Sequence, residues 1–279
     1  MTSKRLYFGG QFVIPRWLKL QRDRIRRVCS TAQIANHPVL FTVREALCRV
    51  PGPLKGTRII AQYVIHGRRV NVQHGTMDVI SLWEIFCQRL YDMPPDLQRQ
   101  LVGAEIQVID FGGNVGYFAL WVDINLPNAT LVAFEADPGN ALRYQESLNL
   151  LGRNEWRLLH GFAGPSDGLV MFAVGEQAQG SKTLDGSGEE VPAIDVFPHL
   201  AKATIVKMDI EGGEWDILAD PRFNFENLRA LVLEYHRHLA PDPDTLGSMT
   251  DLLVSKGYRI IPINHDTESG FGMLWAIRD

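Results

Sequence analysis

The sequence predicts an α/β protein whose mostly parallel sheet of seven strands is covered by helices on both faces, behind a mainly helical N-terminal extension. From Glu105 onward, short runs rich in β-branched residues alternate with segments of helical periodicity, which is typical of βαβ units and a parallel sheet. The chain has 279 residues, 46% of them hydrophobic, which is enough to bury a large core. Its first sixty residues differ from the rest in charge.

The predicted N-terminal extension covers residues 1–75. Residues 1–60 contain twelve Lys or Arg and two acids, although the whole chain has a formal net charge of -4. Residues 17–30 place apolar side chains among five basic residues, which indicates an amphipathic helix with a cationic face. Such a face either packs on the main domain or a partner subunit, or contacts an anionic surface such as a carrier, a phosphorylated substrate or a membrane.

The next segments are predicted from their proline and glycine residues and from the spacing of their apolar residues. Residues 41–50 form a short helix that ends before Pro51, and residues 58–74 alternate around a glycine turn, which suggests a hairpin. Residues 80–93 show helical spacing. From there we assign residues 76–279 to one α/β domain, with its apolar runs at 105–111, 130–136, 156–163, 169–175, 204–210, 230–236, 258–264 and 272–278. The last two runs lie close enough to pair as an antiparallel hairpin at the sheet edge.

Several function classes are disfavoured by composition. A pI near 6.1 argues against a dedicated nucleic-acid binder, and no stretch is long and apolar enough to predict a transmembrane segment. The three cysteines are odd in number and lack metal-ligand spacing, so we expect them to be reduced and mostly buried. We therefore expect a cytoplasmic protein.

A glycine cluster follows the first apolar run of the α/β domain. In VIDFGGNVGYFALW, residues 108–121, Asp110 is followed by Gly112, Gly113, Asn114 and Gly116 before a second apolar run begins. Ligands of parallel sheets bind at the carboxyl ends of the strands, and glycines there let a ligand approach the main chain. A simple strand-to-helix turn would need only one glycine, so the cluster predicts a binding loop.

Glu135 ends the next apolar run, about twenty residues beyond the glycines, where an acid is placed to accept hydrogen bonds from the hydroxyls of a ribose. The ligand is therefore expected to contain adenosine. The spacing D-x-G-G-N-x-G departs from the dinucleotide fingerprint G-x-G-x-x-G, and a leading carboxylate would repel a pyrophosphate. The same carboxylate can attract the cationic end of S-adenosylmethionine, so charge favours a methyl donor over a dinucleotide.

These stretches resemble the FkbM family of S-adenosylmethionine-dependent methyltransferases. VIDFGGNVGYFAL is similar to the first motif of that family, VAFEADP to its second, and LVLEYH, residues 231–236, to its next strand motif. IVKMDIEGGEWDIL, residues 205–218, resembles its most distinctive stretch, D-I-E-G-x-E. The resemblance covers roughly residues 75–279 and includes Asp78 and Tyr91 upstream.

The resemblance implies a Rossmann-like class I methyltransferase that binds S-adenosylmethionine. The loop residues Asp110, Gly112, Gly113, Asn114 and Gly116 would frame the methionine part of the cofactor. Glu135 would hold the ribose, and Ala136 would flank the adenine end. Tyr91 would either lie near the cofactor carboxylate or be an ordinary core residue.

Three acids follow the run at 204–210 and have different expected roles. Asp209 lies where that strand should end, over the ligand-binding edge, and we expect it to be a catalytic and cofactor-binding residue. Glu211 follows two residues later and is a further catalytic candidate. Glu214 is expected in the first turn of the next helix, where the helix dipole stabilises an acid that has no further function.

His236 closes the run at 230–236 beside Glu234 and is the candidate base. Methyl transfer to a hydroxyl is helped by a group that takes its proton, and histidine is suited to this near neutral pH. His238 is a competitor for the role. Asp209 with Glu234 or Glu211 is an alternative site for a divalent cation such as Mg²⁺, which these spacings do not establish.

The expected function is O-methylation of a small-molecule acceptor, a secondary metabolite or a sugar-containing natural product. The alternatives are N-methylation of a similar acceptor and a nicotinamide-dependent oxidoreductase, which the missing G-x-G-x-x-G opposes. The N-terminal extension is expected to cap the acceptor side or to make the contact of a homodimer.

Overall fold

The computed structural model describes residues 16–49, 52–53, 55–172, 188–210, 213–236, 244–266 and 271–278. Its main sheet has seven strands in the order β11-β12-β10-β9-β3-β4-β5. Their bounds are β3 Gln107–Phe111, β4 Thr130–Glu135, β5 Arg157–His160, β9 Ile205–Met208, β10 Ala230–Tyr235, β11 Arg259–Asp266 and β12 Phe271–Ile277. Strands β5, β4, β3, β9 and β10 are parallel, and β12 pairs antiparallel with both β10 and β11. The predicted Rossmann-like fold is confirmed, including the C-terminal hairpin.

Helices cover both faces of this sheet, because its strands alternate apolar side chains toward two cores. Val108 points into a core shared with α4 (Pro95–Gln100), α5 (Tyr117–Asn125) and α6 (Pro138–Leu151). Ile109 points into a second core with α7 (Phe197–Leu200), α8 (Glu214–Ala219) and α9 (Thr245–Ser255). Burial on both faces is why these strands read as continuous apolar runs.

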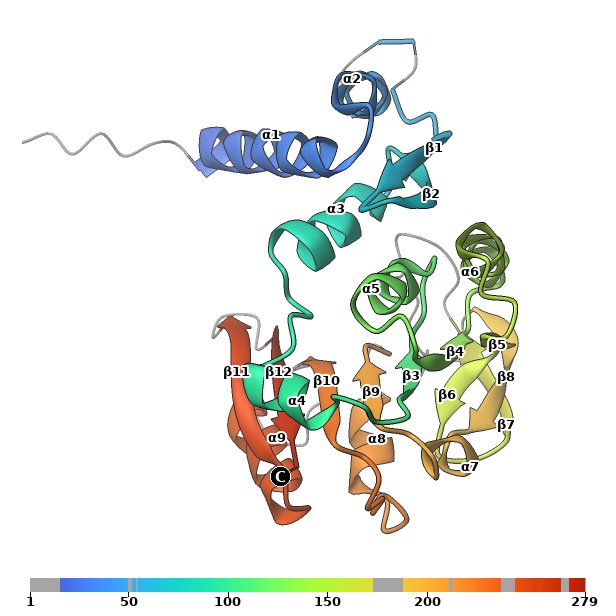
Figure 1. Cartoon of the computed structure of the whole chain (residues 1–279). Helices are drawn as coiled ribbons and strands as arrows, with labels where there is room; N and C mark the ends of the chain where they lie inside the picture. Colours follow the sequence, from blue (N-terminus) through green and yellow to red (C-terminus); the bar gives the residue numbers. More distant parts are fainter. Residues whose placement is uncertain are drawn as a thin grey trace, which may run out of the picture.

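The N-terminal segment contains α1 (Arg16–Ile34), α2 (Pro38–Arg49) and an antiparallel hairpin of β1 (Ile59–Ile65) and β2 (Arg68–His74). The hairpin turn has positive φ at His66 and Gly67, as a tight two-residue turn requires. In Figure 1 this segment lies above the main sheet, on the side of α5. Its Phe41 and Tyr63 belong to the same buried cluster as Phe118 of α5, so one core runs through both parts.

Two details of the secondary structure differ from the sequence-based expectation. The helix expected over residues 80–93 is α3 (Asp78–Leu82) followed by a π-helical turn, η1 (Trp83–Cys87), and it ends there. The described part of the run at 169–175, residues 169–172, joins a separate sheet, β6-β8-β7, made of β6 Phe162–Gly164, β7 Gly168–Phe172 and the unpredicted β8 Glu189–Asp195.

The cysteines are free, but only Cys48 is buried; Cys29 is exposed and Cys87 half-buried, so the expectation that most are buried was wrong. The reason for Cys29 is its place on a part of α1 that does not face the core. Among the residues that the structure describes, no helix combines the length and the apolar character needed to cross a bilayer.

Candidate active site

The loop between β3 and α5 requires glycine at two consecutive positions. Gly112 has φ +77, and a Cβ there would lie 1.8 Å from the backbone oxygen of Asp209. A Cβ on Gly113 would lie 2.6 Å from Cε2 of Tyr144. The first glycine therefore lets β3 and β9 approach each other at their carboxyl ends, and the second lets α6 pack under the loop.

Hydrogen bonds fasten the same loop to the end of β4. The N–H groups of Gly112 and Gly113 donate to the Phe134 oxygen at 3.0 and 2.9 Å. Asn114 adopts φ 51, a left-handed conformation that asparagine tolerates better than most residues, and its N–H donates to Oε2 of Glu135 at 2.6 Å. Gly116, at φ 90, is the N-cap residue immediately before α5. The loop and Glu135 are thus parts of one arrangement.

Glu135 is 6% exposed, and each of its oxygens already accepts one backbone N–H. Oε2 accepts from Asn114, and Oε1 accepts from Asp137 at 2.8 Å. Burial raises the pKa of Glu135 to about 7, against the effect of these two hydrogen bonds. A carboxylate oxygen has two lone pairs, so each can accept one more hydrogen bond, such as one from a ribose hydroxyl.

Ala136 is buried, and its carbonyl oxygen lies 3.2 Å from Nε2 of His160. Asp137 caps α6 by accepting the N–H of Asn140 at 2.9 Å. These contacts fix the chain immediately after Glu135, which is the part that the sequence assigned to the adenine end of a cofactor.

Asp110 is completely buried beneath the loop rather than on a surface that a ligand reaches. Its Oδ1 lies 3.3 Å from Nζ of Lys207, and its Oδ2 accepts the hydroxyl of Tyr144 at 3.1 Å. Burial raises the pKa of Asp110, and Lys207 and Tyr144 oppose that rise. The direct attraction of Asp110 for a cationic cofactor, expected from the sequence, is therefore replaced by an ion pair inside the protein.

A cavity of about 270 Å³ opens beside this loop. Its wall includes Gly112, Gly113, Asn114 and Asp209, so four of the predicted site residues meet there. It also includes residues from the N-terminal segment and the far strands, among them Arg27, Trp83, Glu84, Tyr91, Glu234 and Asn264. Asp110 and Glu135 lie behind the loop and are not part of the wall.

The remaining predicted residues occupy different positions. His236 follows β10 and is not part of the cavity wall. Its Nε2 lies 3.2 Å from Oε1 of Glu234, and Glu234 does line the cavity. Glu211 lies outside the described residues. Glu214 is completely buried at the start of α8, where it accepts the N–H of Ile210 at 2.9 Å, in agreement with a structural role.

Two residues of the site were missed in the sequence. Lys207 is 4% exposed, and its Nζ donates to the carbonyl oxygens of Phe111 and Gly112 at 3.3 and 2.5 Å. A lysine inside the apolar run IVKM was a signal of a buried ion pair. Glu84 gave no such signal, because it stands among apolar residues at helical spacing; burial and the nearby Asp209 raise its pKa to about 7.

The residues that the structure describes contain no group of three or more His, Cys, Asp or Glu side chains that could hold a metal ion. Asp209 and Glu234 both line the cavity, while Glu211, the third member of the expected set, lies outside those residues. The described side chains therefore do not fit a metal centre, and no chemical step is assigned to one.

The chain is similar to known methyltransferases. The model of the Methyltransferase FkbM domain matches residues 102–260, which is more than half of the chain. "Methyltransferase 1" of Beauveria bassiana (strain ARSEF 2860) is 24% identical over 164 residues, which are 48% of this chain and 64% of that protein. The chain thus spans less than two thirds of the length of this relative.

Solved structures are similar at lower levels of identity. TYW2 of M. jannaschii in complex with AdoMet is 13% identical, with 81% of this chain and 90% of that chain covered and a TM-score of 0.40. The Methanococcus jannaschii fibrillarin pre-rRNA processing protein is 11% identical, with 62% and 66% covered and a TM-score of 0.42. The fold assignment itself rests on strand order and register.

Proposed function

This chain belongs to the FkbM methyltransferase domain family, and from that premise we propose that it transfers the methyl group of S-adenosylmethionine to a hydroxyl of a small-molecule acceptor. It is an S-adenosylmethionine-dependent methyltransferase by family, so the nicotinamide-dependent alternative is set aside. The proposed acceptor is a secondary metabolite or a sugar-containing natural product. The observation that carries the proposal is the loop Gly112–Asn114 bonded to Glu135 beside a cavity that Asp209 also lines.

The proposed cofactor would lie over the carboxyl ends of β4, β3 and β9. Glu135 would accept hydrogen bonds from the ribose, and the backbone of Gly112 and Gly113, which carry no side chains of their own, would border the methionine part. Asp110 would act from below by holding Lys207, which in turn holds the loop carbonyls. Asp209 would face the reacting end.

The bound cofactor supplies an electrophilic methyl group, and the residues around the cavity would supply alignment and a proton acceptor. The acceptor oxygen uses a lone pair to bond the methyl carbon, the electrons of the C–S bond remain on sulfur, and the hydroxyl proton leaves to a base. We assign that proton to the pair of Glu234 and His236, whose side chains lie 3.2 Å apart next to the cavity. Asp209 and Glu211 would orient the acceptor.

The N-terminal segment would cap the acceptor side of the site. Arg27 of α1 and Trp83 of η1 both line the cavity, and the guanidinium carbon of Arg27 lies 4.9 Å from the centre of the Trp83 ring. The N-terminal extension, residues 1–75, is thus proposed as an acceptor-side cap, with a homodimer contact through this extension as the alternative role.

The test is mass spectrometry of a panel of hydroxyl-bearing and amine-bearing sugars and secondary metabolites incubated with the protein and S-adenosylmethionine. A mass gain of one methylene on a hydroxyl supports the proposal, and a gain on an amine replaces it with N-methylation. Reactions with S-adenosylhomocysteine in place of the cofactor are the control. Cofactor affinity of Glu135→Ala equal to that of the wild type would remove the ribose assignment.

A further inference from the structure

Three carboxylates line the cavity, and two of them have cationic or imidazole neighbours. Asp209 lies 3.6 Å from Nζ of Lys207, and Glu234 lies 3.2 Å from His236. Glu84 has a weaker neighbour: within the part of the chain that the structure describes, its carboxylate has neither a hydrogen bond nor an ion pair, although the charge of Arg27 acts to lower its pKa. A half-buried carboxylate without a donor is costly unless a cation is bound beside it.

A second polar group in the same wall also lacks a partner. Tyr91 is 6% exposed and lines the cavity, yet its hydroxyl makes no hydrogen bond to any described residue. Burial raises its pKa well above the ordinary value, and Asp209, Glu234, Asp110 and Glu84 raise it further, so the hydroxyl is neutral. A hydroxyl that borders a cavity among carboxylates, with no partner among the described residues, is available to a ligand.

The ligand that fits these groups is a cation. The cavity wall carries four aromatic side chains, Trp83, Tyr91, Tyr117 and Phe118. Arg27 already lies over one of them, Trp83. Aromatic faces together with carboxylate charge attract cations that cannot donate hydrogen bonds, and a sulfonium is such a cation.

We propose that Glu84 supplies the carboxylate that recognises the sulfonium of S-adenosylmethionine and so distinguishes the cofactor from its thioether product, S-adenosylhomocysteine. This inference rests on the proposed function. When the acceptor oxygen bonds the methyl carbon, the C–S electrons return to sulfur and the sulfonium becomes a neutral thioether. The attraction to Glu84 then disappears, which favours release of the product. The π-helical turn Trp83–Cys87 places Glu84 on the wall, in keeping with the frequent use of π-turns at functional sites.

The charge state of Glu84 gives the proposal a pH signature. Because its pKa is raised to about 7, its carboxylate is mostly neutral at pH 6 and mostly charged at pH 8. The charged and titratable groups that share its cavity wall are Arg27 on α1, Lys207 on β9 with Asp209 just after it, Tyr91, and Glu234 on β10, which His236 contacts from outside the wall. Glu135 also titrates near 7, but it would hold the ribose that cofactor and product share.

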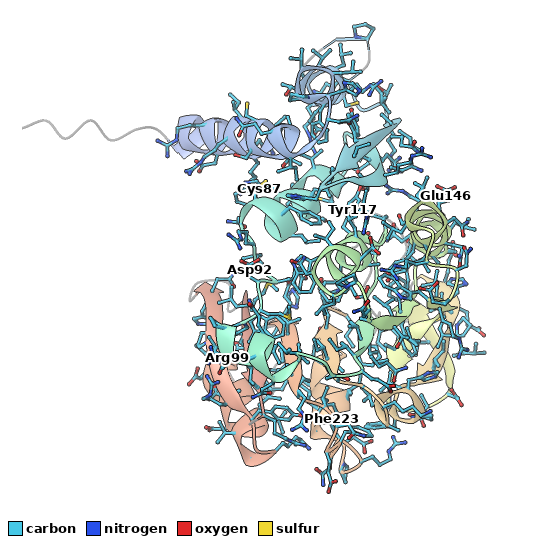
Figure 2. The ribbon with its side chains drawn as sticks, in the orientation of Figure 1. Cys87, Asp92, Arg99, Tyr117, Glu146 and Phe223 are labelled. Carbon is cyan, nitrogen blue, oxygen red and sulfur yellow. The ribbon has the colours of Figure 1, made fainter. Side chains whose placement is uncertain are left out.

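The experiment is isothermal titration calorimetry of S-adenosylmethionine and S-adenosylhomocysteine with the wild type, Glu84→Gln and the matched control Glu146→Gln at pH 6 and pH 8. Glu146 is an exposed glutamate of α6, labelled in Figure 2. We compare the affinity for S-adenosylmethionine divided by the affinity for S-adenosylhomocysteine. For the wild type and the control this ratio should be about tenfold higher at pH 8 than at pH 6, since a shift of one unit in the pKa of Glu84 on cofactor binding corresponds to a tenfold change in affinity. The ratio for Glu84→Gln should be the same at both pH values and about tenfold lower at pH 8.

Other results overturn the proposal in distinct ways. Equal weakening of both ligands by Glu84→Gln would place Glu84 at the amino group that they share, and no change in either would place it on the acceptor side. A wild-type ratio that does not change with pH overturns the proposal even if the variant fails to fold. If the wild type binds neither ligand, the proposed function itself fails.

Discussion

Nζ of Lys207 lies 3.3 Å from Oδ1 of Asp110, and both side chains are almost fully buried, at 4% and 0% exposed. The same Nζ donates to the carbonyl oxygen of Gly112 at 2.5 Å. Burial lowers the pKa of Lys207, but Asp110 and Asp209 outweigh that effect and the pKa is raised. The charged lysine therefore joins the end of β3, the glycine loop and the end of β9.

We expect Lys207→Met to destabilise the protein by about 3–5 kcal/mol, because it leaves the Asp110 charge buried and unpaired. The measurement is the free energy of unfolding in urea. Lys202→Met, at an exposed position, is the control and should change it by less than about 0.5 kcal/mol. The double variant Asp110→Asn with Lys207→Met should recover part of the loss; additive effects would show that the pair is not coupled.

The glycine loop offers a second test with a matched control. Gly112 and Gly103 have nearly the same φ, +77 and +74, but a Cβ at Gly112 would meet the Asp209 oxygen and one at Gly103 would meet nothing within 4 Å. Gly103→Ala should cost only the left-handed strain of about 1–2 kcal/mol. Gly112→Ala should cost roughly 2–5 kcal/mol, because the overlap adds to that strain, and should abolish binding of S-adenosylmethionine. Equal unfolding free energies for the two variants would mean that the close approach is not needed.

Much of the α/β domain was predictable because its strands and its glycine loop are both determined by local sequence patterns. Apolar runs with β-branched residues marked the strands, and glycines with a following acid marked the loop and Glu135. The separate sheet that contains β7 was not predicted, because no local pattern specifies which sheet a strand joins. Glu84 was missed for a similar reason, since only the tertiary fold brings it to Asp209.

Asp78 connects the N-terminal hairpin to α5 and α6. Its Oδ2 accepts the Gln73 N–H at 2.7 Å and the Tyr117 hydroxyl at 2.6 Å, and Arg143 bonds both carboxylate oxygens. Figure 2 shows Tyr117 where α5 meets the hairpin. Few of these contacts are close in sequence, which is why the sequence indicated Asp78 only through family resemblance.

We expect Asp78→Ala to lower the free energy of unfolding by about 3–5 kcal/mol, because it leaves the Arg143 guanidinium without its carboxylate and the buried Tyr117 hydroxyl with only the Asn71 carbonyl oxygen as an acceptor. Asp92→Ala is the matched control: Asp92 is 44% exposed and pairs only with the exposed Arg89 among the described residues, so its loss should cost about 0–1 kcal/mol. Urea denaturation measures both. Similar losses for the two variants would exclude Asp78 as the main link between the hairpin and the domain.

The last prediction concerns the pH dependence of stability at Glu135, whose pKa burial raises from an ordinary value of 4.5 to about 7. Between those values the folded protein keeps the proton and the unfolded chain releases it, so this residue contributes most stability below pH 4.5 and loses it as pH rises to 7. Glu135→Gln cannot ionise. The free energy of unfolding of this variant, relative to that of the wild type, should therefore rise by up to about 3 kcal/mol between pH 4.5 and 7 and stay constant above pH 7. Glu84, which has a similar shift, is present in both proteins and cancels. Urea denaturation across this range measures the difference, and a difference that stays constant with pH would show that Glu135 is charged in the folded protein throughout.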